Sequence, residues 1–419
     1  MLLSRIARKI TGSNGIQSLM EDLGSALGKP KGTTSLLGGG NPARIPEVEK
    51  IYKEALLQLI SSGEIESMFG EYSSPIGNDD IRNATAEYLK EHLGAEIRGE
   101  NIAFFNGSQN AYSYLLNCFS GTMEDGSFKK IILPIVPEYI GYADQTWEDN
   151  VFSSVVPKVL STGAHRFRYG LDKENLDFAS AGCVVLSRPT NPTGNVLSKE
   201  ETLWLYEKTK EYKIPFLLDL AYGNPFPNLI GAAEPIHWMP GMILSLSFSK
   251  VGLPGVRTGI IIADAEIISL LSSFGAVGNL AVGNLGLSLA KVFWKENTLV
   301  KTANTILRPY YEEKSKIAVQ ILEEAFLSQN LAYSFHEPDG GFFLWIHFPR
   351  LKITNKELYR LCKERDVYIV SGHYFFPGLT TDFSHTKQCI RLTYCRDKEE
   401  IARGAKIIAE IVARNSSET

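Results

Sequence analysis

Short apolar segments that alternate with amphipathic helical segments constrain the fold of this chain more than any other feature. The apolar segments that we interpret as strands are residues 102–105, 130–134, 183–187, 215–219, 242–247 and 258–263. Helical periodicity occurs between and before them, at residues 48–60, 80–93 and 198–213. Such an alternation predicts an α/β fold, with a large domain whose mostly parallel sheet is flanked by helices.

The pattern changes near residue 297, where a smaller α+β domain is expected. A long amphipathic helix runs from there to Phe326. Alternating strands at 341–348 and 388–395 follow, with helices at 354–365 and 397–413. A length of 419 residues allows two or three domains. We expect an N-terminal arm (1–48) that joins the small domain, a large domain (49–296) and a small C-terminal domain (297–419).

Charge and composition argue against several classes of protein. The chain has 43 Lys and Arg against 47 Asp and Glu, a net charge of −4, so no global feature favours a nucleic acid partner. Its five cysteines include no CxxC pair and its seven histidines no HExxH spacing, so no metal site is expected. An odd cysteine count also argues against a disulfide framework and fits the cytoplasm.

Two segments resemble targeting or membrane signals. Residues 1–15 are basic but lack the apolar core of a secretory signal, and we interpret them as a short amphipathic helix packed on its own domain. Residues 274–293 are almost uncharged, yet glycines and asparagines dilute the apolar run. We interpret this second segment as a buried Gly-rich helix or loop, and we expect no membrane partner.

Polar clusters follow several predicted strands, at the edge where open parallel sheets bind ligands. Gly107, Ser108 and Gln109 come directly after the strand 102–105, where backbone N–H groups and a helix dipole suit a phosphate. An ordinary helix N-cap explains that cluster equally well. In SRPTNPTGN (187–195), prolines fix the backbone on both sides of Asn191 and present its side chain at a strand end.

Two more clusters add an acid and a lysine. Asp219 ends an apolar strand, so its carboxylate needs a partner. Lys250 and Arg257 flank a Gly-rich stretch, with Ser247 and Ser249 just before it, a combination that suits a dianionic phosphate. A lone lysine is most often a surface charge and a lone strand-end Asp a helix cap. Together, however, these clusters fit a phosphate-bearing aldehyde cofactor with a basic ring nitrogen.

The motifs NGSQNA, PEYIGY, SRPTNPTG, DLAY and SFSK, with Arg257 downstream, resemble those of fold type I pyridoxal 5'-phosphate (PLP) enzymes of the class I and II aminotransferase family. The resemblance spans nearly the whole chain. The segments GIQSLMEDLG, LLGGGNPA and HYFFPGL are similar to the valine–pyruvate subgroup of that family. The resemblance implies a homodimer that moves the amino group between valine, or a similar neutral aliphatic amino acid, and pyruvate, giving 3-methyl-2-oxobutanoate and alanine.

The resemblance also implies roles for individual residues. Lys250 would bond covalently to the cofactor aldehyde and move the proton at the substrate α-carbon. Asp219 would pair with the ring nitrogen, Asn191 and Tyr222 would hydrogen-bond the ring O3', and Tyr139 would stack on the ring. The expected catalytic residues are Lys250, Asp219 and Tyr222.

The remaining roles concern the phosphate and the substrate. The expected phosphate-end residues are Gly107, Ser108, Gln109, Ser247, Ser249 and Arg257. Tyr72 would reach the phosphate of the neighbouring subunit, although a plain surface aromatic is the alternative. Arg391 would fork onto the substrate α-carboxylate, with Gly40 and Asn191 beside it, although a strand arginine can equally form a structural ion pair.

Three alternatives stay open at this point. The same cofactor also supports aminotransfer with other substrates and carbon–sulfur β-elimination. A noncatalytic PLP-binding regulator is a third alternative, but the segment before Gly38 is too short for a winged-helix domain. No second arginine stands in a motif position that demands a dicarboxylic substrate, although Arg44, Arg166 and Arg188 are not excluded.

Overall fold

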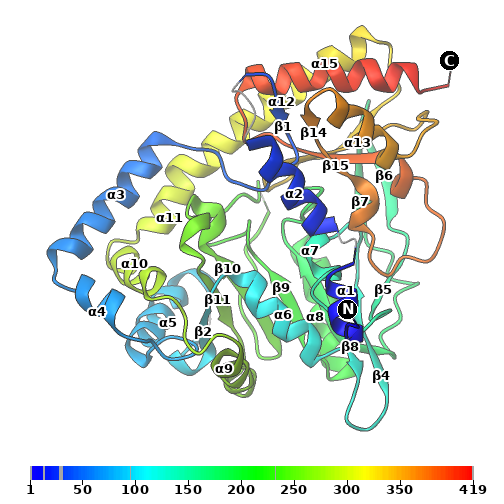
Figure 1. Ribbon diagram of the computed structural model, residues 1–419. Coiled ribbons are helices and arrows are strands. Elements are labelled where there is room, and N and C mark those ends of the chain that lie inside the picture. The colour runs from blue at the N-terminus through cyan, green and yellow to red at the C-terminus, as the bar shows by residue number, and fades with distance from the viewer. Residues whose placement is uncertain (1, 13–14, 28–31, 95, 232, 418–419) are drawn as a thin grey trace.

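The computed structural model describes residues 2–12, 15–27, 32–94, 96–231 and 233–417. In these ranges an eight-stranded sheet forms the centre of the molecule, in the order β2-β11-β10-β9-β8-β4-β3 with β5 beside β4 (Figure 1). Its strands are β2 (Ile102–Phe105), β3 (Gly121–Thr122), β4 (Phe128–Leu133), β5 (Phe152–Ser154), β8 (Ala181–Ser187), β9 (Phe216–Asp219), β10 (Met242–Ser247) and β11 (Gly259–Ile262).

The central strands run parallel, as predicted. β4, β8, β9 and β10 pair in parallel, whereas β11 is antiparallel to both β10 and β2. The register aligns Ser187 of β8 with Asp219 of β9, and Asp219 with Ser245 of β10. Because parallel strands end at one edge of a sheet, this register gathers the polar strand ends of three different motifs.

Helices flank this sheet. They are α3 (Pro46–Ser61), α4 (Ile65–Gly70), α5 (Asp79–Leu93), α6 (Ser108–Cys118), α7 (Ile140–Ala143), α8 (Lys199–Tyr212), α9 (Ala265–Gly278) and α10 (Asn284–Lys295) (Figure 1). Of these, α5, α6, α8 and α9 pack directly on its strands, whereas α3 and α4 pack on α10. In α5, Ile81, Tyr88 and Leu89 are buried at helical spacing. The α/β prediction for this part of the chain is therefore confirmed.

A second, six-stranded sheet has the order β15-β16-β13-β12-β7-β6. Its strands are β6 (Lys158–Gly163), β7 (Arg166–Gly170), β12 (Ser334–His336), β13 (Phe343–His347), β15 (Val370–Ser371) and β16 (Cys389–Thr393). The β6–β7 hairpin comes from the range 49–296, yet β7 pairs with β12. Sequence periodicity did not indicate that this hairpin leaves the first sheet. The division into three domains itself stays a prediction.

Helices α12 (Arg308–Ser328), α13 (Asn355–Glu364) and α15 (Lys398–Arg414) accompany the second sheet (Figure 1). The long helix predicted from residue 297 is interrupted: α11 (Thr298–Thr302) leads into a π-helical turn at Ala303–Leu307 before α12 begins. Pro309 is the physical reason, because proline has no N–H to donate and its ring clashes with the carbonyl one turn earlier.

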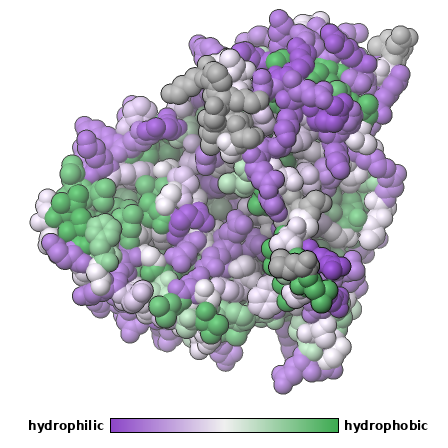
Figure 2. Space-filling view, viewed as in Figure 1, coloured by the Kyte–Doolittle hydropathy of each residue, from purple (hydrophilic) through white to green (hydrophobic). Residues whose placement is uncertain are grey.

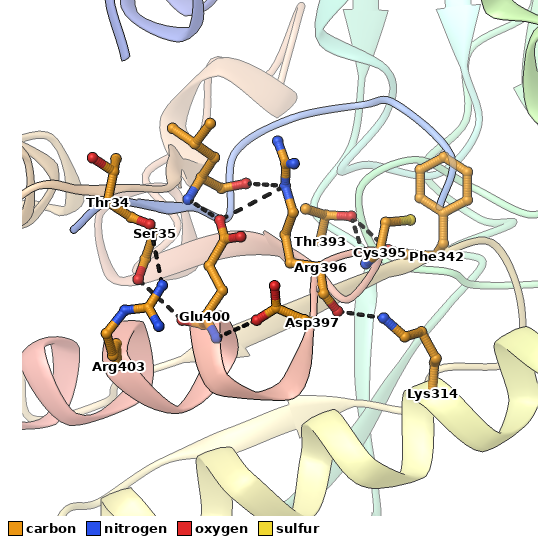
Figure 3. Close-up of polar contacts among 11 residues, drawn as sticks. Thr34, Ser35, Lys314, Phe342, Thr393, Cys395, Arg396, Asp397, Glu400 and Arg403 are labelled. Carbon is orange, nitrogen blue, oxygen red and sulfur yellow. Dashed lines mark hydrogen bonds and ion pairs between the residues drawn. The ribbon is translucent and has the colours of Figure 1, made fainter. Parts of the chain in front are cut away.

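The segment Thr34–Leu37 is fastened to the C-terminal part of the chain. Its strand β1 (Ser35–Leu36) pairs with β14 (Val367–Tyr368), and the Glu400 side chain accepts the Leu36 N–H at 2.6 Å. Figure 3 shows Ser35 and Arg396 completing this cluster, with Arg396 Nε donating to the Leu36 carbonyl at 3.1 Å. These contacts fix where the following glycines, 38–40, enter the site.

The segments 274–293 and 1–15, which resemble membrane or targeting signals, contain helices that contact the rest of the chain. Residues 274–293 form the end of α9 and most of α10, where a side chain at Gly286 would collide with Thr258. In residues 1–15, α1 (Arg5–Ile10) is described, and Lys9 Nζ donates to Thr146 Oγ1 at 2.9 Å, while residues 1, 13 and 14 lie outside the described ranges. No helix within the described ranges has the length and apolar character needed to cross a membrane.

Candidate active site

The predicted cofactor residues converge on one cavity of about 720 Å³ that opens to solvent. Those that line it are Ser108, Gln109, Tyr139, Asn191, Asp219, Tyr222, Ser247, Ser249, Lys250 and Arg257. Lining residues that the sequence motifs did not single out are Tyr112, Tyr142, Gln145, Ser187, Pro189 and Ala221. Motifs spread over some 150 residues thus meet at the carboxyl edge of the parallel strands.

Asp219 lies at the floor of the cavity and accepts three hydrogen bonds. Oδ2 accepts from the Tyr142 hydroxyl at 2.9 Å, and Oδ1 accepts from Ser245 Oγ at 3.1 Å and the Ala221 N–H at 2.9 Å. Burial raises the pKa of Asp219, while these donors and Lys250 oppose the rise. The carboxylate is therefore oriented before any ligand arrives. Sequence reasoning missed Tyr142, although its i+3 spacing from Tyr139 is a usable signal.

Lys250 faces the same cavity from the turn Phe248–Val251 after β10. Its Nζ donates to the Gly40 carbonyl at 2.9 Å and lies 5.4 Å from the centre of the Tyr222 ring. Burial lowers the pKa of this amine to about 8. A larger fraction of Lys250 is thus neutral near physiological pH than for a solvated lysine, and the neutral amine is the nucleophilic and basic form.

The phosphate end of the cavity is formed around Gly107 and the start of α6. Gly107 has φ of 92°, and a side chain here would collide with the guanidinium of Arg257. Arg257 makes only long hydrogen bonds, such as 3.5 Å to Ser249 Oγ and 3.4 Å to the Asn106 carbonyl. With Ser108 and Gln109 opening α6, a cation, hydroxyls and helix N–H groups lie together, which is the donor set for a phosphate.

Tyr139 forms one wall of the cavity. Its hydroxyl lies 3.4 Å from Gln109 Oε1, and its ring packs edge-on against Tyr142 at 5.3 Å. A side chain at Gly141 would collide with the Tyr139 ring, so the glycine in PEYIGY makes this ring position possible. The exposed aromatic face suits stacking with a planar ring.

Arg391 stands on β16, is 2% exposed and contacts the cavity through Asn191, which lines it. Nη1 donates to Asn191 Oδ1 at 2.9 Å and Nη2 donates to the Gly38 carbonyl at 2.7 Å, while no described residue accepts a hydrogen bond from Nε. The guanidinium stacks 4.1 Å from the centre of the Phe343 ring. Burial lowers its pKa to about 10, so it stays charged at neutral pH without a carboxylate to balance it.

The other arginines left open by the sequence do not line this cavity. Arg44 pairs with Glu49, Arg166 pairs with Glu323 at 2.8 Å, and Arg188 lines a different cavity beside Asp339. Tyr72 is 85% exposed and also lies outside the cavity of its own chain. Within the described residues, no cluster of His, Cys, Asp and Glu suits a metal ion.

The residues present fit PLP by their chemistry. Among the described residues, the buried Tyr222 hydroxyl and the Arg391 Nε have no hydrogen-bond partner, so both donors are available to a polar ligand. A buried acid at one end and a cationic, Gly-rich turn at the other match a basic ring nitrogen and a phosphate. Lys250 lines the same cavity with a partly neutral amine.

Known proteins share both the sequence and the fold. The model of the aminotransferase class I and II family matches residues 157–408. Valine–pyruvate aminotransferase of Escherichia coli strain K12 is 40% identical over 100% of both chains. The crystal structure of valine–pyruvate aminotransferase from Salmonella typhimurium LT2 has a TM-score of 0.87 and 38% identity, covering 96% of this chain and 99% of that one.

A more distant structure shares the fold. Kynurenine aminotransferase of Pyrococcus horikoshii, in complex with PMP, has a TM-score of 0.79 at 19% identity and covers 100% of this chain and 98% of its own. The fold type I prediction is therefore confirmed. On this evidence the chain belongs to the class I and II aminotransferases, PLP-dependent enzymes that transfer amino groups between amino acids and 2-oxo acids.

Proposed function

We propose that this aminotransferase moves the amino group between valine, or a similar neutral aliphatic amino acid, and pyruvate, giving 3-methyl-2-oxobutanoate and alanine. The observation that carries the proposal is the convergence of Lys250, Asp219 and Asn191 on one cavity, with the Arg391 guanidinium hydrogen-bonded to Asn191. The identity of 40% to the E. coli enzyme over the full chain supports the choice of substrates.

Arg391 is the proposed anchor of the substrate. A guanidinium presents parallel N–H donors that match a carboxylate, and the α-carboxylate is common to amino acids and 2-oxo acids. Asn191 and Gly38 hold the fork in place before the substrate binds. We therefore assign Arg391 to carboxylate binding, with Asn191 and Gly40 alongside the substrate.

Lys250 is the proposed catalytic base and the covalent attachment point of the cofactor. When bound, PLP carries the amino group between the two substrates and withdraws electrons from the substrate α-carbon. The Lys250 amine, with its pKa lowered to about 8, would take the proton from that carbon and deliver it to C4', the carbon that carries the aldehyde of the cofactor. Asp219 holds the ring nitrogen in its protonated form by charge pairing.

The other residues hold the cofactor in place. Asn191 and Tyr222 would donate to the ring oxygen, and Tyr139 would stack on the ring face. The proposed phosphate ligands are Gly107, Ser108, Gln109, Ser247, Ser249 and Arg257.

The charge of the cavity favours a neutral substrate side chain. Arg257 lines the phosphate end and Arg391 stands ready for one carboxylate, while Arg44, Arg166 and Arg188 lie elsewhere. Within the described part of one chain, a second carboxylate of a dicarboxylic acid would meet no further arginine in this cavity. A neutral aliphatic side chain carries no such requirement.

We also propose that the enzyme is a homodimer. Figure 2 shows hydrophobic residues gathered over α3 and α4 at the left of the molecule. Leu57 and Ile60 of α3 and Phe69 of α4 are exposed there, with Phe69 at 76%. A surface of this kind favours association with a second copy. Tyr72, next to it, would reach the phosphate in the partner's cavity.

The unbridged state of all five cysteines fits a proposed cytoplasmic location.

A spectroscopic titration tests the reaction. The purified protein is loaded with PLP, and L-valine is added while the visible absorbance of the bound cofactor is followed. The proposal predicts bleaching by valine and full recovery on adding pyruvate. Valine converts the cofactor from its aldehyde form to its amine form, and pyruvate converts it back. Release of ammonia and pyruvate from a sulfur amino acid, with no response to valine, would instead identify a β-lyase.

A further inference from the structure

Glu138 is a fully buried acid beside the site, and neither the sequence motifs nor the proposed mechanism give it a role. Its exposed fraction is 0%, and it does not line the cavity. Oε1 accepts the Ser187 N–H at 2.6 Å. Oε2 accepts the Ser187 hydroxyl at 2.7 Å and the Tyr139 N–H at 2.8 Å. Burying a carboxyl group is costly, and here both oxygens accept hydrogen bonds that offset the cost.

These hydrogen bonds join separate segments of the site. Tyr139 forms the wall proposed to stack on the cofactor ring, and Ser187 begins the segment that presents Asn191. The backbone N–H of Glu138 donates to the Phe375 carbonyl at 2.8 Å. The Phe375 ring lies 5.4 Å from the Arg391 guanidinium. Through its backbone, Glu138 is therefore also connected to the surroundings of the residue proposed to bind the substrate carboxylate.

The surroundings of Glu138 place its ionisation in the physiological range. Burial raises its pKa to about 7, and the charge of Asp219 adds to the rise, while the donors from Ser187 and Tyr139 oppose it. The other titratable groups that sense its charge are the buried phenols of Tyr112 on α6 and Tyr142 on α7. The carboxylate form accepts these hydrogen bonds more strongly than the protonated form does.

We propose that Glu138 is a positioning residue, whose carboxylate fixes Tyr139 and the Ser187–Asn191 segment relative to one another for transamination, while its backbone N–H holds the Phe375 loop. The proposal rests on the function proposed above. It acts through neighbouring groups and touches neither substrate nor cofactor.

The isosteric variant E138Q tests the role. Its amide nitrogen must replace one oxygen, so in either orientation an NH₂ group faces the N–H of Ser187 or of Tyr139, and one backbone hydrogen bond is lost. Hydrogen exchange of the cofactor-free protein, followed by mass spectrometry, should accelerate about tenfold or more in peptides that cover 138–142 and 185–191. The control E207Q removes a charge that is well exposed on α8 and should leave these peptides unchanged.

The kinetic readout is the pH profile of kcat/KM. In the wild type, the value should fall on the acid side of an inflection near pH 7, as Glu138 gains a proton. E138Q should lower kcat/KM about tenfold at pH 8 and lack that inflection. S187A, which removes one of the two contacts from Ser187 and retains the acid, should give an intermediate loss and keep the inflection.

Two results would overturn the role. One is unchanged exchange in both peptide regions of E138Q. The other is a lower melting temperature in E138Q and S187A with an unaltered pH profile, which would mean a purely structural acid. The exchange experiment needs no substrate. If exchange accelerates in E138Q but the wild-type enzyme is inactive with valine, the proposed substrates are wrong and the positioning role of Glu138 still stands.

Discussion

The Arg391 guanidinium donates to the side-chain carbonyl of Asn191 at 2.9 Å, joining β16 to the end of β8 across 200 residues of sequence. Asn191 is thus oriented by the residue proposed to bind the substrate. Its carbonyl faces Arg391, which leaves its amide N–H groups to donate toward the cavity. The substrate anchor and a proposed cofactor ligand are therefore one connected unit.

This connection predicts that Arg391→Lys damages both functions. Lysine keeps the charge but cannot donate to Asn191, to Gly38 and to a carboxylate in one plane. We expect kcat/KM for valine to fall by about 30-fold to 150-fold, equivalent to about 2–3 kcal/mol. Steady-state kinetics with R360K as the matched control check this, because Arg360 is paired with exposed glutamates. Equal kinetics in the two variants would remove Arg391 from substrate binding.

Tyr142→Phe should weaken the hold on the cofactor without altering the fold. The variant keeps the ring that stacks on Tyr112 and removes the hydroxyl that donates to Asp219 at 2.9 Å. Loss of a hydrogen bond to a charged group costs about 1.5–3 kcal/mol. We expect the dissociation constant of PLP, measured by absorbance, to rise by about 10-fold or more. Y212F, on a partly exposed tyrosine, is the control, and an identical constant for both variants would contradict the role of Tyr142.

Gly107→Ala should be far more damaging to PLP affinity than Gly126→Ala. Both glycines have positive φ, 92° and 81°, so both substitutions strain the backbone, by about 1–3 kcal/mol each. Only at Gly107 does the new Cβ collide with Arg257, whereas no atom lies within 4 Å of it at Gly126. We expect G107A and G126A to lose similar amounts of thermal stability. Only G107A should lose affinity for PLP, measured by absorbance titration. Equal PLP affinities would show that this turn does not hold the phosphate.

Acid should destabilise the protein through two buried histidines. Burial lowers the pKa of His336 and His385 to about 3, below the ordinary value of about 6.5. The unfolded chain therefore binds more protons, and their contribution to stability, present above pH 6.5, is lost as pH falls toward 3. Each costs about 1.4 kcal/mol per pH unit in that window. Urea unfolding from pH 7.5 to 5 checks this, and a shallower slope is expected in H385F. A slope unchanged by that substitution would count against the assignment.

Phe69→Asp should dissociate the proposed dimer. The side chain is 76% exposed in one chain, and a charge there would be buried by a second copy. Analytical ultracentrifugation should show monomers for F69D. Leu327, which is 61% exposed on α12, provides the control L327D, which should remain dimeric. A wild-type protein that sediments as a monomer would refute the dimer outright.

The strand ends and their motifs were predictable because local sequence determines them. An apolar run that stops at Asp219 or Ser247 reveals both a parallel strand and the polar residue at its end. Which strands become neighbours is a tertiary outcome, so the pairing of the β6–β7 hairpin with β12 had no local signal. The π-helical turn at 303–307 is different, because Pro309 shortly after it is a local signal that helical periodicity alone does not take into account.

Site residues divide in the same way. Lys250, Asn191 and Asp219 stand in recognisable motifs, so the family resemblance is sufficient to locate them. Tyr142 and Glu138 lie inside the PEYIGY motif, but their roles depend on contacts to β8 and β9 that sequence spacing does not encode. Tyr72 is placed near an exposed apolar surface, and its role in a partner's site stays a prediction.

Isotope transfer tests the central claim most directly. The enzyme is incubated with PLP, [¹⁵N]valine and unlabelled pyruvate, and the products are quantified by mass spectrometry. The account predicts [¹⁵N]alanine and 3-methyl-2-oxobutanoate in equal amounts, with no product from Lys250→Ala. Label recovered as ammonia, or left in valine while another amino acid donates readily to pyruvate, would contradict it.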